Sequence, residues 1–197
     1  MNKTTLKGGA MLAPVPPTLI SCGDGETKNI FTVAWTGIMC TDPAVTYISV
    51  RPSRYSYDII EKTGEFVINL VPASLARACD TCGVKSGRDV NKWELFNLHP
   101  QSASQVNAPL IEECPVNIEC SVREKLSLGT HDVFIADILA VNVDSNLIDK
   151  NGKVCLWKAN LLAYAHGSYY TLGKHIGDFG FSVRKKSTKR KKTGKFN

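Results

Sequence analysis

Apolar and polar residues alternate with a period of two along several short segments of this chain. The cleanest run spans residues 116–123, with apolar members Val116, Ile118, Cys120 and Val122. Side chains of a strand point alternately to its two faces, so this pattern is typical of a strand with one buried face. Further strands are expected at residues 18–22, 31–36, 45–51, 65–71, 132–143 and 160–166. Turn-forming clusters separate these runs, which predicts a mainly β protein built as an antiparallel barrel or sandwich.

Helical signals are fewer and shorter than the strand signals. Helical spacing is found at residues 54–62, which precede Gly64, at residues 73–81, which precede Gly83, and at residues 91–97. Glycine just after a helix is a common end signal. No long helix recurs between the strands, as a doubly wound parallel sheet would require. A few short helices beside an antiparallel sheet are therefore expected.

The charge of the chain is unevenly placed. The 197 residues are enough for one domain with a substantial core, and the formal net charge is +6. Residues 184–195 contain eight basic and no acidic side chains, whereas the rest carries 16 basic and 18 acidic ones, a net charge of −2. We predict a folded domain at residues 1–183 and a basic, disordered tail at residues 184–197. Nonspecific binding of polyanions by this tail is the alternative, although nucleic acid is not the expected partner of the domain.

The sequence also limits where the protein works. No apolar run approaches the roughly 20 residues of a membrane-spanning helix, and three prolines interrupt the apolar stretch at residues 10–20. A signal peptide needs an uninterrupted apolar core, so we expect a cytoplasmic protein with no membrane partner.

Seven cysteines, an odd number in a chain expected inside the cell, are predicted to be reduced thiols. The one close pair is Cys79 and Cys82, and the second pair that a zinc site would need is absent. We predict no metal site, and buried structural thiols with a redox-active pair as the alternative.

Residues 49–57 read Ser-Val-Arg-Pro-Ser-Arg-Tyr-Ser-Tyr, where a strand ends and a helix begins. Arg51 and Arg54 offer forked donors, Ser53 and Ser56 add hydroxyl groups, and the free N–H groups of a helix start favour a phosphate. This segment is a candidate anion site. The alternative is that one of the serines caps the helix while the arginines lie on the surface.

Two more segments are candidates for the same site. Residues 83–93 form a glycine-punctuated loop with Lys85, Arg88 and Lys92, which can reach the anion from another side unless the loop is a solvated turn. Along residues 29–37 small and aromatic side chains alternate, so a flat ring can lie against exposed backbone there, with ordinary core packing as the alternative. Signatures of serine hydrolases, zinc proteases, P-loop proteins and dinucleotide-binding folds are absent, which excludes acyl, phosphoryl and zinc chemistry of those kinds.

Taken in order, these segments resemble a known family. The series runs Asn-x-Phe-Thr-x-Ala-Trp-x-Gly at 29–37, Asp-Pro at 42–43, Ser-x-Arg-Pro-x-Arg-Tyr-Ser-Tyr at 49–57, Thr-Gly-Glu-Phe-Val-Ile-Asn-Leu at 63–70 and Cys-Gly-x-x-Ser-Gly-Arg-Asp-Val at 82–90. It resembles the flavin reductase-like proteins of the FMN-binding split barrel, especially the flavoredoxin and ferric reductase branch. The resemblance covers residues 8–183, with Asp137, Asn91 and Trp93 departing conservatively from the family's usual Glu, Asp and Phe.

The resemblance implies a homodimer of Greek-key split β-barrels with one FMN per protomer, reduced by NADH or NADPH. Residues 54–56 would take the phosphate, the strand at 29–35 would present backbone amides to the ring, and residues 86–88 would close the site. The residues implied around the cofactor are Asn29, Phe31, Thr32, Val33, Ala34, Trp35, Ser49, Arg51, Arg54, Tyr55, Ser56, Ser86, Gly87 and Arg88. His131 would orient the hydride donor as the catalytic residue, or would be a turn histidine satisfied by solvent or by Asp132.

Two functions follow from the resemblance, because one scaffold can host both. The first is an FMN-containing reductase that passes electrons from a nicotinamide to free flavin, ferric complexes or a protein acceptor. The second is a flavoredoxin-like electron carrier reduced by a partner protein. A module that acts on polyanions through the basic tail is the third possibility.

Overall fold

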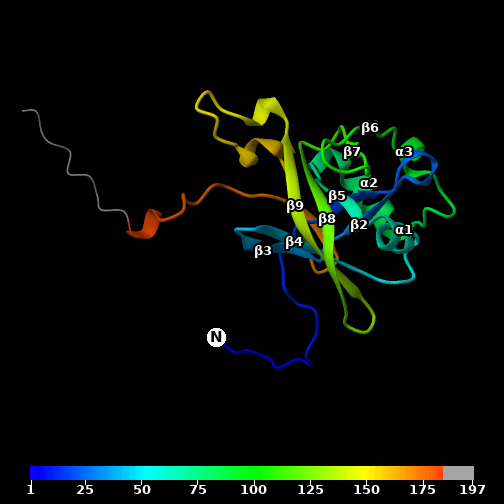
Figure 1. Cartoon of the computed structure of the whole chain (residues 1–197). Coiled ribbons are helices and arrows are strands. Elements are labelled where there is room, and N and C mark those ends of the chain that lie inside the picture. Colours follow the sequence, from blue (N-terminus) through cyan, green and yellow to red (C-terminus); the bar gives the residue numbers. More distant parts are fainter. Residues whose placement is uncertain (184–197) are drawn as a thin grey trace, which may run out of the picture.

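The computed structural model describes residues 1–183 (Figure 1), so the predicted basic tail at residues 184–197 lies outside the described residues. The described chain is mainly β, as predicted. The seven strands of its main sheet are all paired antiparallel in the order β2-β1-β5-β8-β9-β4-β3. Their bounds are β1 (Thr18–Cys22), β2 (Asn29–Val33), β3 (Thr36–Thr41), β4 (Ala44–Val50), β5 (Glu65–Leu70), β8 (Val116–Ser127) and β9 (Asp132–Val143).

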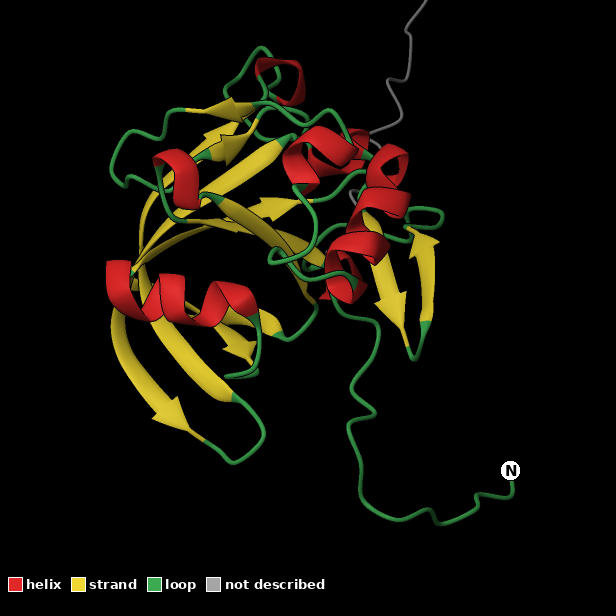
Figure 2. Cartoon of the chain, turned by 90° about the vertical axis from the view of Figure 1, so that its right-hand side faces the viewer, coloured by secondary structure: helices red, strands yellow, loops and turns green. Residues whose placement is uncertain are grey.

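The strand order shows that this sheet curls back toward its own starting edge. Strands β2 and β3 stand at opposite ends of the order, yet only Ala34 and Trp35 separate them along the chain. The sheet therefore curls until its two edges approach each other, and Figure 2 shows the strands curving around a common centre. Because β2 and β3 are not hydrogen-bonded neighbours, the barrel stays open along this line.

Smaller elements surround the barrel. Two short hairpins pair β6 (Pro100–Gln101) with β7 (Leu110–Ile111), and β10 (Leu162–Ala165) with β11 (Ser168–Thr171). The helices are α1 (Tyr55–Thr63), α2 (Ala76–Val84) and α3 (Lys92–Leu95), with 3-10 turns at residues 25–27, 73–75, 145–147, 156–159 and 181–183. None of the helices in residues 1–183 is long and apolar enough to span a membrane.

The core has two main parts. Inside the barrel, buried side chains from the strands meet α1, and this cluster includes Ile20, Ile48, Ile60, Phe66 and Phe134. A second cluster beneath α2 and α3 includes Leu19, Ile30, Trp93, Ile111 and Leu162. The second cluster packs the two helices against β1 and β2, which fixes α2 beside the open line of the barrel.

The cysteines are mostly part of these cores. Five of the seven are buried, namely Cys22, Cys79, Cys82, Cys114 and Cys120, and all seven are free. Burial raises the pKa of Cys79 to about 12 and that of Cys82 to about 11. The thiols of this pair therefore stay protonated at neutral pH, in agreement with the structural role predicted for them.

Three sequence predictions need correction. The strand expected at residues 31–36 ends at Val33, because the chain turns at residues 34–35 to begin β3. The helix expected at residues 73–81 starts as a 3-10 turn and continues through Gly83 to Val84. The helix expected at residues 91–97 is only α3, whose start is capped by Asn91 through a 3.1 Å hydrogen bond from the Trp93 N–H.

The alternation along β8 also differs from the prediction of one exposed face. The polar residues Asn117 and Glu119 are buried, as are the apolar residues Val116 and Cys120. Residues 104–105 cover this face, and the Glu119 carboxylate accepts hydrogen bonds from the Ser104 N–H at 2.9 Å and the Gln105 N–H at 2.6 Å. The first part of the polar side of β8 is therefore buried under a loop that satisfies Glu119, whereas Arg123 further along the strand is exposed.

Candidate functional site

Two cavities adjoin each other beside the open line of the barrel. Their volumes are about 350 Å³ and 460 Å³, and both are lined by Phe31, Arg51, Arg54 and Val84. We call the first of these the ring cavity and the second the basic cavity. The ring cavity contains the predicted residues Phe31, Thr32, Val33, Ala34, Trp35, Ser49, Arg51, Arg54 and His131, and the basic cavity adds Asn29, Tyr55, Ser56, Ser86, Gly87 and Arg88. The structure thus brings all the predicted site residues to one continuous hollow.

The basic cavity lies at the start of α1. Arg54 is the residue just before the first turn, its backbone is extended, and no side chain caps the helix. The Tyr57 N–H already donates to the Arg54 carbonyl at 2.9 Å, so the N–H groups of Tyr55 and Ser56 are the ones left for another acceptor, as an anion site requires. Ser56 lies within α1, its side chain is buried, and its hydroxyl accepts a 2.7 Å hydrogen bond from the Asn29 side-chain amide. It is therefore not the helix cap considered as the alternative to an anion site.

The loop at residues 86–88 approaches α1 closely. A Cβ atom at Gly87 would lie closer than 3.0 Å to the side chains of Asn29 and Tyr55, so only glycine allows this approach. Arg88 places its guanidinium 5.3 Å from the centre of the Tyr55 ring and donates to the Ser53 carbonyl at 3.5 Å. Residues of the loop and the helix thus share one wall of the basic cavity.

Lys92 does not lie in a solvated turn, which was the alternative considered for this loop. It lies at the start of α3, is almost completely buried, and donates from Nζ to the carbonyls of Ile30 at 2.7 Å and Cys82 at 3.2 Å. Burial lowers the pKa of this ammonium group. The side chain also lines the basic cavity, so it places a positive charge behind that cavity while linking β2 to α2.

The ring cavity follows the free edge of β2. Because β2 is the end strand of the sheet, the backbone groups on its outer edge have no strand partner and can meet a ligand. Beyond the strand, Trp35 is 45% exposed, and its carbonyl accepts a 2.9 Å hydrogen bond from the Ser49 N–H. The cavity therefore combines a strand edge without a strand partner and an accessible aromatic wall.

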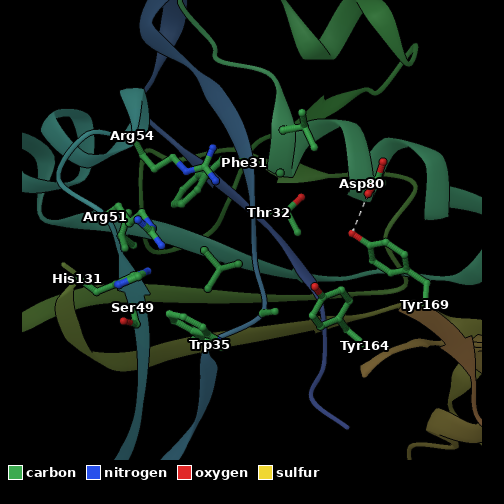
Figure 3. A pocket seen from close by; sticks show the side chains of 15 residues that line it. Phe31, Thr32, Trp35, Ser49, Arg51, Arg54, Asp80, His131, Tyr164 and Tyr169 are labelled. Carbon is green, nitrogen blue, oxygen red and sulfur yellow. Dashed lines mark hydrogen bonds between the residues drawn. The ribbon is translucent and has the colours of Figure 1, made fainter. Parts of the chain in front are cut away.

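His131 packs against Trp35 on one side of the hollow, with ring centroids 4.6 Å apart (Figure 3). Its Nδ1 lies 3.0 Å from the Thr130 hydroxyl. The neighbouring Asp132 carboxylate instead accepts from the buried Tyr57 hydroxyl, so it is not the partner that the alternative gave to His131. Burial lowers the pKa of His131, and the nearby charges of Arg51 and Arg54 lower it further, which favours the neutral imidazole.

Sequence reasoning missed one wall of the ring cavity. Tyr164 and Tyr169 from the hairpin β10–β11, together with Asp80 from α2, line the side opposite His131 (Figure 3). The Tyr169 hydroxyl donates to Asp80 Oδ1 at 3.3 Å, and the two tyrosine rings pack edge to face with centroids 5.2 Å apart. No local motif marks these residues, since their role depends on where the hairpin docks.

Comparisons with known proteins agree with this architecture. The flavoredoxin of Desulfovibrio vulgaris (Miyazaki F) superposes with a TM-score of 0.86 at 27% identity, covering 93% of this chain and 100% of that one. A putative flavin reductase with a split barrel domain from Shewanella frigidimarina shares the fold, with a TM-score of 0.74 and 23% identity over 83% and 85% of the two chains. The FMN reductase (NADH) RutF of Stutzerimonas stutzeri is 22% identical over 111 residues, which are 56% of this chain and 62% of that protein.

A family model described as "Flavin reductase like domain" matches residues 11–173. The open antiparallel barrel is therefore a split barrel, and the function is a flavin-related oxidation–reduction or electron-transfer role. On this match, the chain belongs to the flavin reductase-like family.

Proposed function

We propose that this protein is an FMN-dependent oxidoreductase that accepts hydride from NADH or NADPH and passes the electrons to a second acceptor. The observation that carries the proposal is the joined pair of cavities. One is basic and holds a free helix start, which suits a phosphate, and the other has an open strand edge and aromatic walls, which suit a flat ring. FMN carries both groups in one molecule.

The residues present fit such a cofactor. Arg51, Arg54 and Arg88 would neutralise the phosphate, and the N–H groups of Tyr55 and Ser56 at the start of α1 would hydrogen-bond to it. The outer edge of β2 would orient the ring, and the buried ammonium of Lys92 would supply a positive potential behind the basic cavity. Bound FMN would supply the hydride and one-electron chemistry, whereas the protein would supply binding, orientation and electrostatics.

His131 is proposed to orient the nicotinamide. It lies at the accessible side of the ring cavity against Trp35, and its lowered pKa favours a neutral ring that can donate one hydrogen bond and accept another. A neutral imidazole also avoids repulsion with the positively charged nicotinamide ring that forms once the hydride has left. This role requires contact with the donor and no proton transfer.

A second candidate is an electron carrier that a partner protein reduces. The similarity to a flavoredoxin, at 27% identity over 93% of the chain, favours it. The two candidates share the cofactor and differ in whether the ring cavity admits a nicotinamide.

One experiment separates the two candidates. The visible spectrum of the purified protein and identification of the released chromophore establish whether FMN is bound, and anaerobic addition of NADH or NADPH follows. Rapid bleaching by either donor supports the reductase, and bound FMN that stays oxidised supports the carrier. Failure to take up FMN on reconstitution would refute both.

We further propose that the protein forms a homodimer. Apolar side chains remain exposed on β3, where Ile38 is 64% exposed, and along residues 172–183, where Leu172 and Ile176 are also exposed. That terminal segment extends away from the barrel (Figure 1). A second copy of the chain would remove these side chains from water.

A further inference from the structure

The charges that line the two cavities are strongly unbalanced. The basic side chains are Arg51, Arg54, Lys85, Arg88 and Lys92. Among the lining residues of both cavities in the described chain, Asp80 is the one acidic side chain. A single carboxylate in an otherwise basic hollow changes the local potential most for ligands that pass close to it.

Asp80 lies at a distinct end of the ring cavity. It belongs to α2 and, in Figure 3, lies across the cavity from Arg51, Arg54 and His131. The phosphate proposed for the basic cavity would neutralise part of the positive charge at the arginine end. The Asp80 end would then keep its negative charge beside the path to the ring.

Tyr169 holds this carboxylate in place. Its hydroxyl donates to Asp80 Oδ1, and burial, with further contributions from the nearby Cys79 and Asp80, raises the pKa of the phenol, so it keeps the proton that it donates. This contact uses Oδ1 and leaves the Oδ2 atom of Asp80 as a further acceptor, and the Tyr169 oxygen retains lone pairs. Toward a ligand, the pair therefore presents mainly negative charge and acceptor atoms.

We propose that Asp80, positioned by Tyr169, determines acceptor specificity by slowing electron transfer to anionic acceptors relative to cationic ones. The proposal rests on the proposed function, because it places the flavin ring in the ring cavity. A fixed negative charge beside the entry path lowers the local concentration of anions and raises that of cations. Asp80 therefore shifts the preference toward small cationic or neutral acceptors and away from polyanionic metal complexes.

The test measures reoxidation of the FMN-loaded protein and uses no nicotinamide. The bound flavin is reduced anaerobically with stoichiometric dithionite and mixed in a stopped-flow instrument with ferricyanide, a trianion, or hexaammineruthenium(III), a trication. Two metal ions are reduced for each flavin oxidised, and the protons of the reduced flavin pass to water. Rates are measured at low salt and again at about 1 M salt, where the Debye length is about 3 Å.

Removing the charge should move the two rates in opposite directions. For Asp80→Asn at low salt, we expect the rate with ferricyanide to rise about five- to tenfold and that with hexaammineruthenium(III) to fall by a similar factor, as a unit charge roughly 10 Å from a trivalent ion predicts. Both changes should vanish at high salt. Tyr169→Phe should show smaller changes of the same signs, because Asp80 keeps its charge but loses its position.

A matched control separates this effect from a loss of structure. Asp58→Asn removes an exposed acid of α1 that lines neither cavity and should leave the ratio of the two rates unchanged. FMN content and melting temperature verify each variant. Equal changes of both rates in Asp80→Asn, or none, would overturn the inference while leaving the proposed function intact, whereas a wild-type protein that takes up no FMN would overturn both.

Discussion

Arg54 lies where the start of α1 meets the two cavities. It is the last residue before α1, and its side chain lines both cavities. We expect Arg54→Ala to weaken FMN binding by about 1.5–3 kcal/mol, the range for a hydrogen bond to a charged group, and to weaken riboflavin binding much less because riboflavin has no phosphate. Fluorescence titration with both ligands checks this, with Arg77→Ala on the exposed side of α2 as the control. Equal losses for the two ligands would contradict a phosphate site.

His131 is predicted to make stability depend on pH. Burial and the charges of Arg51 and Arg54 lower its pKa in the folded protein, whereas an unfolded chain titrates near the ordinary value of about 6.5. The unfolded state therefore binds more protons as the pH falls below about 6.5, and stability decreases until the lower folded pKa is passed. In urea unfolding at pH 7 and pH 5, His131→Gln should lose less stability than the wild type. An equal loss in both proteins would show that this histidine is not responsible.

Strand β8 illustrates how one polar side chain can hold a loop against a sheet. Burial raises the pKa of Glu119, but hydrogen bonds from Ser104, Asn142 and Gln105 outweigh burial, so the pKa lies below its ordinary value. Glu119→Gln should lower the free energy of unfolding by about 1–3 kcal/mol, because a neutral amide cannot accept all of these bonds. Urea unfolding at pH 7 checks this, with the exposed Glu124→Gln on the same strand as the control.

The lowered pKa of Glu119 also predicts how the free energy of unfolding depends on pH in the acid range. A group with a lowered pKa in the folded state stabilises the protein above its unfolded pKa of about 4.3, and this contribution is lost as the pH falls through the folded value. The difference in stability between wild type and Glu119→Gln should therefore shrink below about pH 4. A difference that stays constant down to pH 3 would show that the hydrogen bonds do not depend on the charge.

At the scale of the whole molecule, the exposed apolar side chains predict that two copies of the chain associate. We expect light scattering to give about twice the 21.6 kDa mass of one chain. Leu172→Glu combined with Ile176→Glu should shift the protein toward the monomer, because two charges would then be buried in the proposed contact. The control is Lys174→Glu, which changes a polar residue in the same exposed segment. A monomeric wild-type protein would refute the homodimer.

Local patterns account for most of the strands and for the candidate site. Period-two alternation predicted β8 and β9, since burial on one face of a strand leaves a direct trace in the order of residues. The candidate anion site at residues 49–57 was also predicted from the sequence, because a strand end followed by a helix start has its own residue preferences. The cofactor segments were recognised from the ordered series of motifs that resembles the family.

Other features depended on how distant segments meet. The turn at Ala34 and Trp35 exists because the sheet curls and brings its two edges together, and a single strand would have carried the same alternation. Lys92 resembles any loop lysine in sequence, yet the packing of α3 places its ammonium on two backbone carbonyls. Asp80 and Tyr169 are 89 residues apart, and only the docking of β11 beside α2 joins them. Periodicity records which face of an element is buried, whereas tertiary packing decides which distant side chains share a cavity, because that depends on contacts between segments far apart in the chain.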